Sequence, residues 1–517
     1  MKKVITGEEL YDCEEQAIEL LCGTVKKTLG PRGSNAIIDH SLMSPFITND
    51  GVTIARNIES EDERINTILT LAKEASIKTD ETVGDGTTTT LVLLESIFKS
   101  GLAKIKEGTN PHILKNELDN ALESVIEEIK KESKIPSEEN YYDIASIAAS
   151  DKNIGKLITS MYLKLKVGSA IKIEESKTSE TYTKIINGYS FEPILASPYF
   201  FNNTNEITYK NCLILIMTKE VNEIEEISEI INYTIEKRIP LVILATDYSE
   251  EVINEVLSLN FNKITNVTLL KLPEYGLHQM DVLKDLEIIS KAKMVKVSDE
   301  LSLNNLGKCE EIKITKDLAI ICNNLKSEAI KKHINKLKER VKTIDNDFEL
   351  EFLNNRLAKL TNGIGMIYVG ATTTTEAREK KMRFDDALCA LKSATKGIIP
   401  GSGLILLKIK ENLETKNNGS TILKEALDKP FMQILENVGV KPNDIYNKIK
   451  ENNFNVIYNA LENKLESISK TKVIDPTNVV IATLKNAVSI AGMLLTTSSL
   501  IINEFKENNN YNINNEI

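Results

Sequence analysis

The chain of 517 residues contains no tryptophan, four histidines and six cysteines. No two cysteines form a Cys-x-x-Cys pair, and the histidines show no paired spacing. The sequence therefore predicts neither a transition-metal site nor a disulfide framework. Buried, reduced thiols are the expected state of the cysteines.

Positive charge and long apolar runs are also scarce. The 64 Lys and Arg are outnumbered by 75 Asp and Glu, which gives a net charge of −11. This balance disfavours binding to nucleic acid or to anionic membranes. Residues 1–9 turn acidic before any apolar run develops, so they do not resemble a signal peptide. No stretch is predicted to span a bilayer, and a cytoplasmic protein is expected.

The arrangement of elements predicts more than one domain, because the chain is longer than one hydrophobic core usually serves. Helical spacing is predicted near both ends of the chain, in residues 14–27, 63–78, 87–99, 111–131, 375–396, 421–438 and 476–495. In the middle, apolar runs at 213–217, 241–245 and 267–270 alternate with helical segments at 221–237 and 250–259. That alternation predicts an α/β domain with a parallel core. The Asn-rich tail, 506–517, is expected to fray.

One loop has the features of a phosphate site. A predicted helix opens with Gly84-Asp85-Gly86-Thr87-Thr88-Thr89-Thr90. Glycines allow close backbone approach, and a helix start offers free N–H groups and a positive dipole end. Asp85 is unfavourable beside a phosphate unless a cation lies between them, so it is a candidate Mg²⁺ ligand. The alternative is an ordinary N-cap, but four threonines exceed what capping requires.

Two further turns lie within sixty residues of this loop. They are Thr28-Leu29-Gly30-Pro31-Arg32-Gly33 and Thr48-Asn49-Asp50-Gly51. Either turn alone is common in proteins. The first is a second candidate for a phosphate-facing turn, and the three turns together are more informative than any one of them alone.

In their order and spacing, these three motifs resemble the nucleotide-binding half of the chaperonins. The similarity extends through Val369-Gly370-Ala371, Asp385-Asp386-Ala387-Leu388, Tyr458-Asn459-Ala460 and Ile474-Asp475-Pro476-Thr477. The segment Ser197-Pro198-Tyr199-Phe200, and the lack of an added lid segment, favour group I, the GroEL type.

The resemblance implies a chaperonin fold: a multidomain α/β protein with a mostly α-helical equatorial domain. The equatorial domain is expected in residues 1–134 and 398–517, the intermediate domain in 135–188 and 365–397, and the apical α/β domain in 189–364.

The resemblance also implies residue roles, with ATP and Mg²⁺ as cofactors. The expected nucleotide contacts are Thr28, Leu29, Gly30, Pro31, Asp85, Gly86, Thr87, Thr88, Thr89, Gly401, Asn459, Ala460 and Asp475. Asp85 is the expected metal ligand. Asp386 resembles the carboxylate that orients the attacking water, with Asp50 as a second acidic residue near the γ-phosphate. Successive helical residues point about 100° apart, so Asp385 and Asp386 cannot both face the site.

Partners are implied in the same way. They are unfolded polypeptides, copies of the chain in a sevenfold ring that is expected to be double, and a small co-chaperonin. The expected client-binding residues are Tyr199, Phe200, Ile227, Ile231, Ile253, Val256 and Leu257. For the helical residues among them, burial in the core is the alternative.

Several positions depart from the chaperonin pattern. Asn49 replaces a lysine, Pro400-Gly401-Ser402-Gly403 replaces a glycine run, and Phe191-Glu192-Pro193-Ile194-Leu195 lacks an arginine. The Gly-Gly-Met tail is also absent. ATP-driven folding of unfolded polypeptides is the leading hypothesis. The alternatives are a divergent holdase or scaffold with weak ATPase, and an unrelated ATP-using metabolic enzyme, for which no second catalytic constellation is present.

Overall fold

The structure is a computed structural model that describes residues 2–503 except 41–42, 166–169, 177, 203, 205, 275, 317, 324, 326 and 345. The predicted frayed tail therefore lies outside the described residues. The chain divides into two compact units, Met1–Thr159 with Ala371–Ile517, and Ser160–Gly370. Both ends of the chain thus contribute to the first unit, and the second unit is an insertion.

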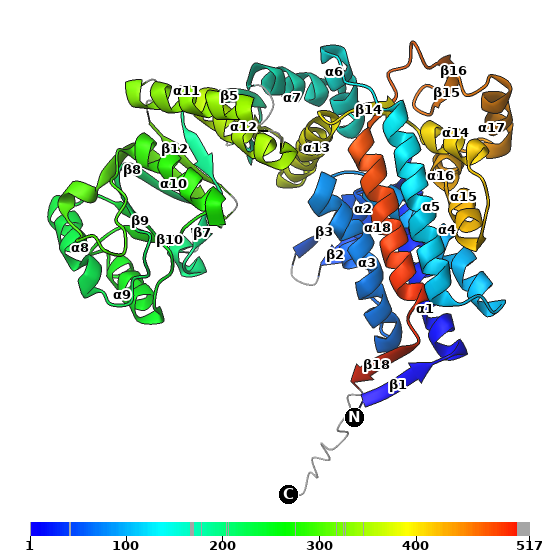
Figure 1. Ribbon diagram of the computed structural model, residues 1–517, viewed down its shortest axis with the longest axis horizontal. Coiled ribbons are helices and arrows are strands. Elements are labelled where there is room, and N and C mark those ends of the chain that lie inside the picture. Colours follow the sequence, from blue (N-terminus) through cyan, green and yellow to red (C-terminus); the bar gives the residue numbers. More distant parts are fainter. Residues whose placement is uncertain are drawn as a thin grey trace, which may run out of the picture. The chain divides into compact units, whose positions relative to one another are not determined.

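The first unit is mostly helical (Figure 1). Its helices are α1 (Glu8–Val25), η1 (Lys26–Thr28), α2 (Gly51–Asn57), α3 (Glu63–Val83), α4 (Thr87–Lys106), α5 (Pro111–Glu132), α6 (Glu138–Ala148), α7 (Lys152–Leu165, which crosses into the second unit), α13 (Thr374–Ala394), α14 (Leu404–Asn412), α15 (Asn418–Ala426), α16 (Lys429–Val438), α17 (Pro442–Glu451) and α18 (Thr477–Leu495). Short strands pair as β1 (Lys2–Thr6) with β18 (Ser499–Asn503), β2 (Ala36–His40) with β3 (Met43–Thr48), β14 (Ile398–Pro400) with β17 (Ile474–Pro476), and β15 (Val456–Asn459) with β16 (Lys464–Ser467).

Helix α18 runs through the core of the first unit, where it packs against α3, α4 and α5 (Figure 1). By length and composition it could cross a membrane, so the expectation that no stretch passes that test is wrong. Sixty-seven per cent of its apolar window is buried, however. Its apolar residues on all sides are therefore explained by packing inside this unit.

One helix predicted from spacing is interrupted. The segment 421–438 lies in α15 and α16, which are separated by Leu427 and Asp428. Pro430 is in the first turn of α16. Proline lacks an N–H and its ring clashes with the preceding turn of a helix, so a new helix starts there instead of one helix continuing.

The second unit contains a seven-stranded sheet in the order β6-β12-β11-β8-β9-β10-β7. Its strands are β6 (Tyr189–Phe191), β7 (Ile194–Leu195), β8 (Glu206–Ile216), β9 (Leu241–Ala245), β10 (Val267–Lys271), β11 (Gly307–Thr315) and β12 (Ala319–Cys322). Strands β8, β9 and β10 are parallel neighbours, joined through α8 (Glu225–Lys237) and α9 (Glu250–Phe261). The predicted α/β unit with a parallel core is confirmed.

The rest of the second unit comprises η2 (Pro198–Phe201), α10 (Gly276–Ser290), η3 (Leu303–Asn305), α11 (Glu328–Thr343), α12 (Asp347–Thr361), and a sheet of β4 (Ile171–Glu175), β13 (Ile364–Val369) and β5 (Tyr182–Ile186). The fully buried Asp285 on α10 accepts hydrogen bonds from Tyr189, His333 and Arg356. This carboxylate therefore joins β6, α11 and α12 to α10. The division into three domains at the expected boundaries stays a prediction.

Candidate functional site

The start of α4 is held in place by two glycines in left-handed conformations. Gly84 (φ 64°) ends α3, and Gly86 (φ 79°) caps α4. A Cβ at Gly84 would lie 2.4 Å from the sulfur of Cys389, and one at Gly86 would lie 2.6 Å from Thr483. Only glycine fits both the backbone conformation and the close approach of α13 and α18. The Asp85 loop is therefore fixed between these two helices.

The threonines of this helix start divide into two groups. Thr90 is fully buried, and its hydroxyl lies 3.0 Å from that of Thr79 and 3.1 Å from the Gly86 carbonyl. Within the described part of the chain, the hydroxyls of Thr87, Thr88 and Thr89 have no hydrogen-bond partner. Three hydroxyl donors and the first N–H groups of α4 therefore remain without a partner at the start of this helix among the described residues.

The Asp50 turn lies against this helix start. The carboxylate of Asp50 accepts a hydrogen bond from the Thr53 N–H at 2.9 Å and so caps α2. A Cβ at Gly51 would be 2.3 Å from the Thr88 hydroxyl oxygen. The position therefore requires glycine, and two of the predicted motifs come together here.

Carboxylates from four elements lie near the start of α4 and repel one another. Burial and the charge of Asp50 raise the pKa of Asp85. Burial, followed by the charges of Asp85 and Asp50, raises the pKa of Asp386 well above its ordinary value. Burial and Asp85 raise the pKa of Asp475 to about 7. Asp386 is half-buried whereas Asp385 is exposed, so the side chain of Asp386 is the one that faces the other carboxylates.

These residues fit a magnesium-bound polyphosphate. Among the described residues, no group of three or more His, Cys, Asp or Glu side chains is arranged to hold a metal ion. Mg²⁺ in nucleotide sites is usually bound by one or two carboxylates together with the phosphates. A half-buried Asp85 beside free hydroxyls and a helix N-terminus supplies that donor set.

The Thr28 turn is held by residues that the sequence patterns did not single out. The Asn437 side-chain amide donates to the carbonyls of Lys26 and Leu29, at 3.0 and 2.9 Å. Arg32 donates to the carbonyls of Ala460 and Leu461, at 3.2 and 3.1 Å. The structure therefore brings the predicted Thr28–Pro31 and Asn459–Ala460 segments together through Arg32. No spacing signal could have linked residues more than 400 positions apart in the sequence.

The remaining predicted contacts belong to the C-terminal part of the first unit. The Asn459 side chain accepts from the N–H groups of Leu461 and Glu462 and donates to Glu466, so it shapes its own turn. Gly401 lies against Asp475, since a Cβ there would be 2.8 Å from a carboxylate oxygen. Thr28 is buried, and its hydroxyl donates to the Val25 carbonyl at 2.9 Å.

The TCP-1/cpn60 chaperonin family model matches residues 21–504. This chain belongs to the TCP-1/cpn60 chaperonin family. Two crystal structures of the chaperonin gp146 from the bacteriophage EL 2 (Pseudomonas aeruginosa), both in presence of ATP-BeFx, share its fold at 20% identity. The match covers 97% of this chain and 99% of each gp146 chain, with TM-scores of 0.79 (crystal form II) and 0.71 (crystal form I). The predicted family and fold class are confirmed.

The polypeptide-binding side chains expected of this chaperonin are placed differently from the prediction. Tyr199 is 81% exposed, but Phe200, Ile227, Ile231 and Val256 are buried in the core of the second unit. These four side chains are not available to a client in this structure, because they pack under α8, α9 and η2 against the sheet. Ile253 and Leu257 are half-buried on the outer part of the same core.

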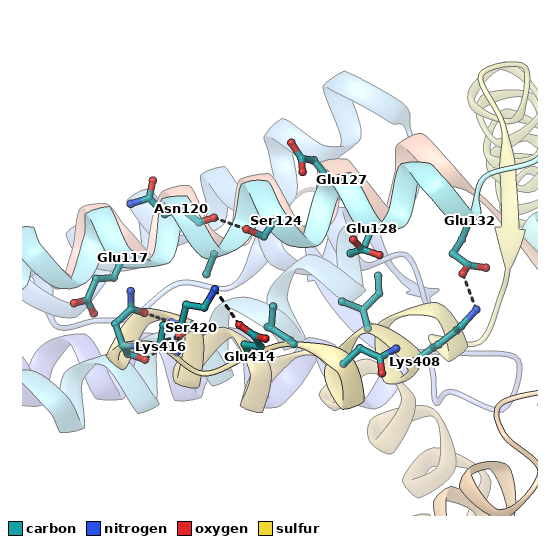
Figure 2. Close-up of a pocket in the computed structure, with 15 residues that line it drawn as sticks. Glu117, Asn120, Ser124, Glu127, Glu128, Glu132, Lys408, Glu414, Lys416 and Ser420 are labelled. Carbon is teal, nitrogen blue, oxygen red and sulfur yellow. Dashed lines mark hydrogen bonds and ion pairs between the residues drawn. The ribbon is translucent and has the colours of Figure 1, made fainter.

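The chaperonin also has a groove of about 560 Å³ away from the predicted site (Figure 2). It lies between α5 and the segment 408–420, and none of the predicted residues lines it. Five glutamates and two lysines line the groove, and Lys408 and Lys416 are paired with Glu132 and Glu414. This excess of negative charge disfavours a polyphosphate ligand, and the described lining of the groove has no helix start with free threonine hydroxyls of the kind found at α4.

Proposed function

We propose that this chain is an ATP-hydrolysing chaperonin of the group I type that binds unfolded polypeptides and drives their folding. The observation that carries the proposal is that three kinds of chemical group lie together at the start of α4. Unpartnered threonine hydroxyls, a helix N-terminus, and the carboxylates of Asp50, Asp85 and Asp386 meet there.

The nucleotide phosphates would accept hydrogen bonds from the α4 N–H groups and from Thr87, Thr88 and Thr89. A magnesium ion, held by Asp85 together with the phosphates, would neutralise charge on the transferred phosphoryl group. Water would attack the γ-phosphorus as the bond to the β–γ bridging oxygen breaks. Asp386 would accept a proton of that water, and the bridging oxygen would leave with the electron pair of the broken bond and become a terminal oxygen of ADP.

Repulsion from the neighbouring carboxylates determines when Asp386 can act as a base. Its pKa is raised by burial and by Asp85 and Asp50, so without a cation it tends to hold its own proton. Neutralisation of Asp85 would lower that pKa and free the carboxylate. Asp386 is on α13, which begins shortly after the second unit ends at Gly370, so hydrolysis would be sensitive to movement of that helix.

The partners proposed with this function are unfolded polypeptides, a ring of identical chains and a small co-chaperonin, in the cytoplasm. A sevenfold and double ring follows the resemblance to the GroEL type. The folding activity would depend on ATP turnover, whereas the ring would form without it.

The test is the pair of variants Asp386→Ala and Asp385→Ala. We expect Asp386→Ala to lower kcat by about 10²–10⁴-fold, the usual contribution of a general base. Binding of a fluorescent ATP analogue should be retained. The neighbouring Asp385 is exposed, and the charges that act on it are those of Lys381 and Lys392, so its alanine variant should lose far less turnover. Unchanged turnover in Asp386→Ala, or equal losses in both variants, would remove Asp386 from this role.

A second candidate is a divergent holdase with weak ATPase. It is favoured by Asn49, an exposed residue at the Asp50 turn where the family has a lysine. The two functions separate in a refolding assay. A holdase would keep a denatured client soluble but would not release it when ATP and a co-chaperonin are added.

A further inference from the structure

Two buried cysteines lie opposite each other in the centre of the seven-stranded sheet. Cys212 on β8 is paired with Cys309 on β11, and the two side chains are 0% and 3% exposed in the core of the second unit. Residues directly opposite in an antiparallel pair point to the same face of the sheet, with Cα atoms about 4.5–5.5 Å apart. A disulfide requires about 4.4–6.8 Å between its Cα atoms. The backbone of these two strands therefore already has the spacing of a cross-strand disulfide.

Both thiols are reduced in this structure, and their surroundings favour that state. The Cys212 thiol donates to the Leu213 carbonyl at 3.2 Å. Burial, followed by the Cys309 side chain, raises the pKa of Cys212 well above its ordinary value. Because the thiolate is the reactive form of cysteine, this thiol reacts slowly by itself. A strong oxidant and local opening of the sheet are therefore needed before the pair changes.

The ladder between β8 and β11 is weakened directly beside the pair. Among the described residues it skips one position, at which Asn211 and Glu310 would be opposite each other. Asn211 has a left-handed backbone (φ 51°), which asparagine tolerates better than most residues. Both residues of the skipped position are exposed. Because interrupted, solvent-exposed pairing opens at a low free energy, Cys309, next to Glu310, is the thiol that a small oxidant reaches first.

We propose that Cys212 and Cys309 are a modification site, at which hydrogen peroxide converts the two thiols into a disulfide between β8 and β11. The Cys309 thiolate attacks one peroxide oxygen, the O–O bond breaks, and the departing hydroxide takes up the proton of Cys309 to become water. The sulfur of Cys212 then attacks the sulfenic acid formed on Cys309, so that the S–S bond forms and the S–O bond breaks. The Cys212 proton leaves with that oxygen as a second water. Two thiols are oxidised and one peroxide is reduced, and the reaction needs no bound nucleotide.

The new bond would join the two halves of the sheet. Strand β8 belongs to the parallel half with β9 and β10, whereas β11 leads to β12 and β6 on the other side. The disulfide closes a loop of roughly 100 residues, and long closed loops restrict the unfolded chain most. The oxidised second unit should therefore unfold at a temperature at least about 5 °C higher than the reduced one.

The experiment maps disulfides in the full-length protein after treatment with hydrogen peroxide. Remaining thiols are blocked with N-ethylmaleimide, the protein is digested without reduction, and linked peptides are identified by mass spectrometry. In the native protein the 212–309 linkage should exceed any other linkage at least about tenfold, because the sheet holds this pair directly opposite. In urea that preference should disappear. Dithiothreitol should restore both thiols and the original unfolding temperature.

Cys322→Ala is the matched control. Cys322 is on the next strand, β12, opposite Glu311, and packs against a separate cluster around Ile320. Its variant should keep the 212–309 linkage and the thermal shift, whereas Cys212→Ala and Cys309→Ala should lose both. The map of the unsubstituted protein gives its answer even where a variant fails to fold.

Four results would overturn the proposal. They are sulfinic acid at Cys309 without a linkage, a linkage of Cys309 to Cys322, linkages between two chains, and two thiols that stay reduced in excess peroxide. None of these results bears on the proposed ATPase, which is measured under reducing conditions.

Discussion

The proposed nucleotide site in the first unit and the exposed apolar side chains of the second are built in opposite ways. Around α4, the backbone is fixed by Gly84 and Gly86, and the polar groups are half-buried and mutually repelling. Around α9, the supporting side chains are buried, and the groups left outside are the exposed ends of Tyr199, Phe261 and Ile264. A fixed array of donors and charges selects one ligand of defined shape. Exposed apolar tips beside diffuse charge accept many ligands of one general chemistry.

Repulsion between carboxylates distinguishes the site from burial elsewhere in the same unit. Glu14 is 1% exposed in the core, and burial alone raises its pKa to about 8. The pKa of Asp386 is raised by burial and also by neighbouring charges. A cation at the site should therefore change the titration of Asp386 and leave that of Glu14 unaffected.

The largest predicted effect is the pH dependence caused by Glu14. The folded state holds the Glu14 proton up to about pH 8, whereas the unfolded chain releases it near its ordinary pKa of 4.5. The contribution of Glu14 to stability is therefore fully present below about pH 4.5, falls as pH rises, and levels off above about pH 8, a total loss of up to about 5 kcal/mol. Glu14→Gln removes this loss. Urea denaturation of both proteins at several pH values inside this window gives the difference, and parallel pH curves would contradict the burial of Glu14.

The next largest effect is the loss of stability expected when the left-handed glycine at the start of α4 is replaced. We expect Gly86→Ala to destabilise the first unit by about 2–4 kcal/mol, through left-handed strain and overpacking, and to lose ATP binding. Its new Cβ would lie 2.6 Å from Thr483. Gly439 has a similar φ of 84°, but a Cβ added there would meet no atom within 4 Å. Gly439→Ala should therefore cost only the strain, about 1 kcal/mol. Equal losses in denaturation would show that α18 yields to the added methyl group.

A smaller effect separates buried from exposed residues on α9. Val256 is fully buried and Phe261 is 80% exposed. Val256→Ala should lower stability by about 1–3 kcal/mol, whereas Phe261→Ala should change it by less than about 0.5 kcal/mol, although phenylalanine is larger. Thermal denaturation measures both. A large loss in Phe261→Ala would mean that its ring is covered in the assembled protein.

These contrasts explain what the sequence could predict. The turns at Gly30, Gly51 and Gly86 specify backbone conformations and close approaches, so local motifs could single them out, and the structure brings Gly51 against the start of α4. Apolar spacing on α8 and α9 specifies a face but not its degree of burial. Ile227, Ile231 and Val256 were therefore predicted as surface and found in the core, whereas Phe261, at a helix end, was missed. The Arg32 contacts depend on the approach of distant segments, which no local pattern encodes.

The smallest predicted effect concerns Arg32, which joins the phosphate-side turn to the Asn459–Ala460 turn through two carbonyls. Under the proposed function it would act on the nucleotide through these turns, as a positioning residue, so Arg32→Met should raise KM for ATP about 3–10-fold and change kcat by less than about twofold. Arg32→Lys keeps the charge but loses the two-pronged geometry, so it should restore only part of the loss. Lys27→Met removes an exposed charge from the same turn and should leave KM nearly unchanged. If Lys27→Met matches Arg32→Met, general attraction of the phosphates accounts for the effect, and the hydrogen bonds between the two turns do not.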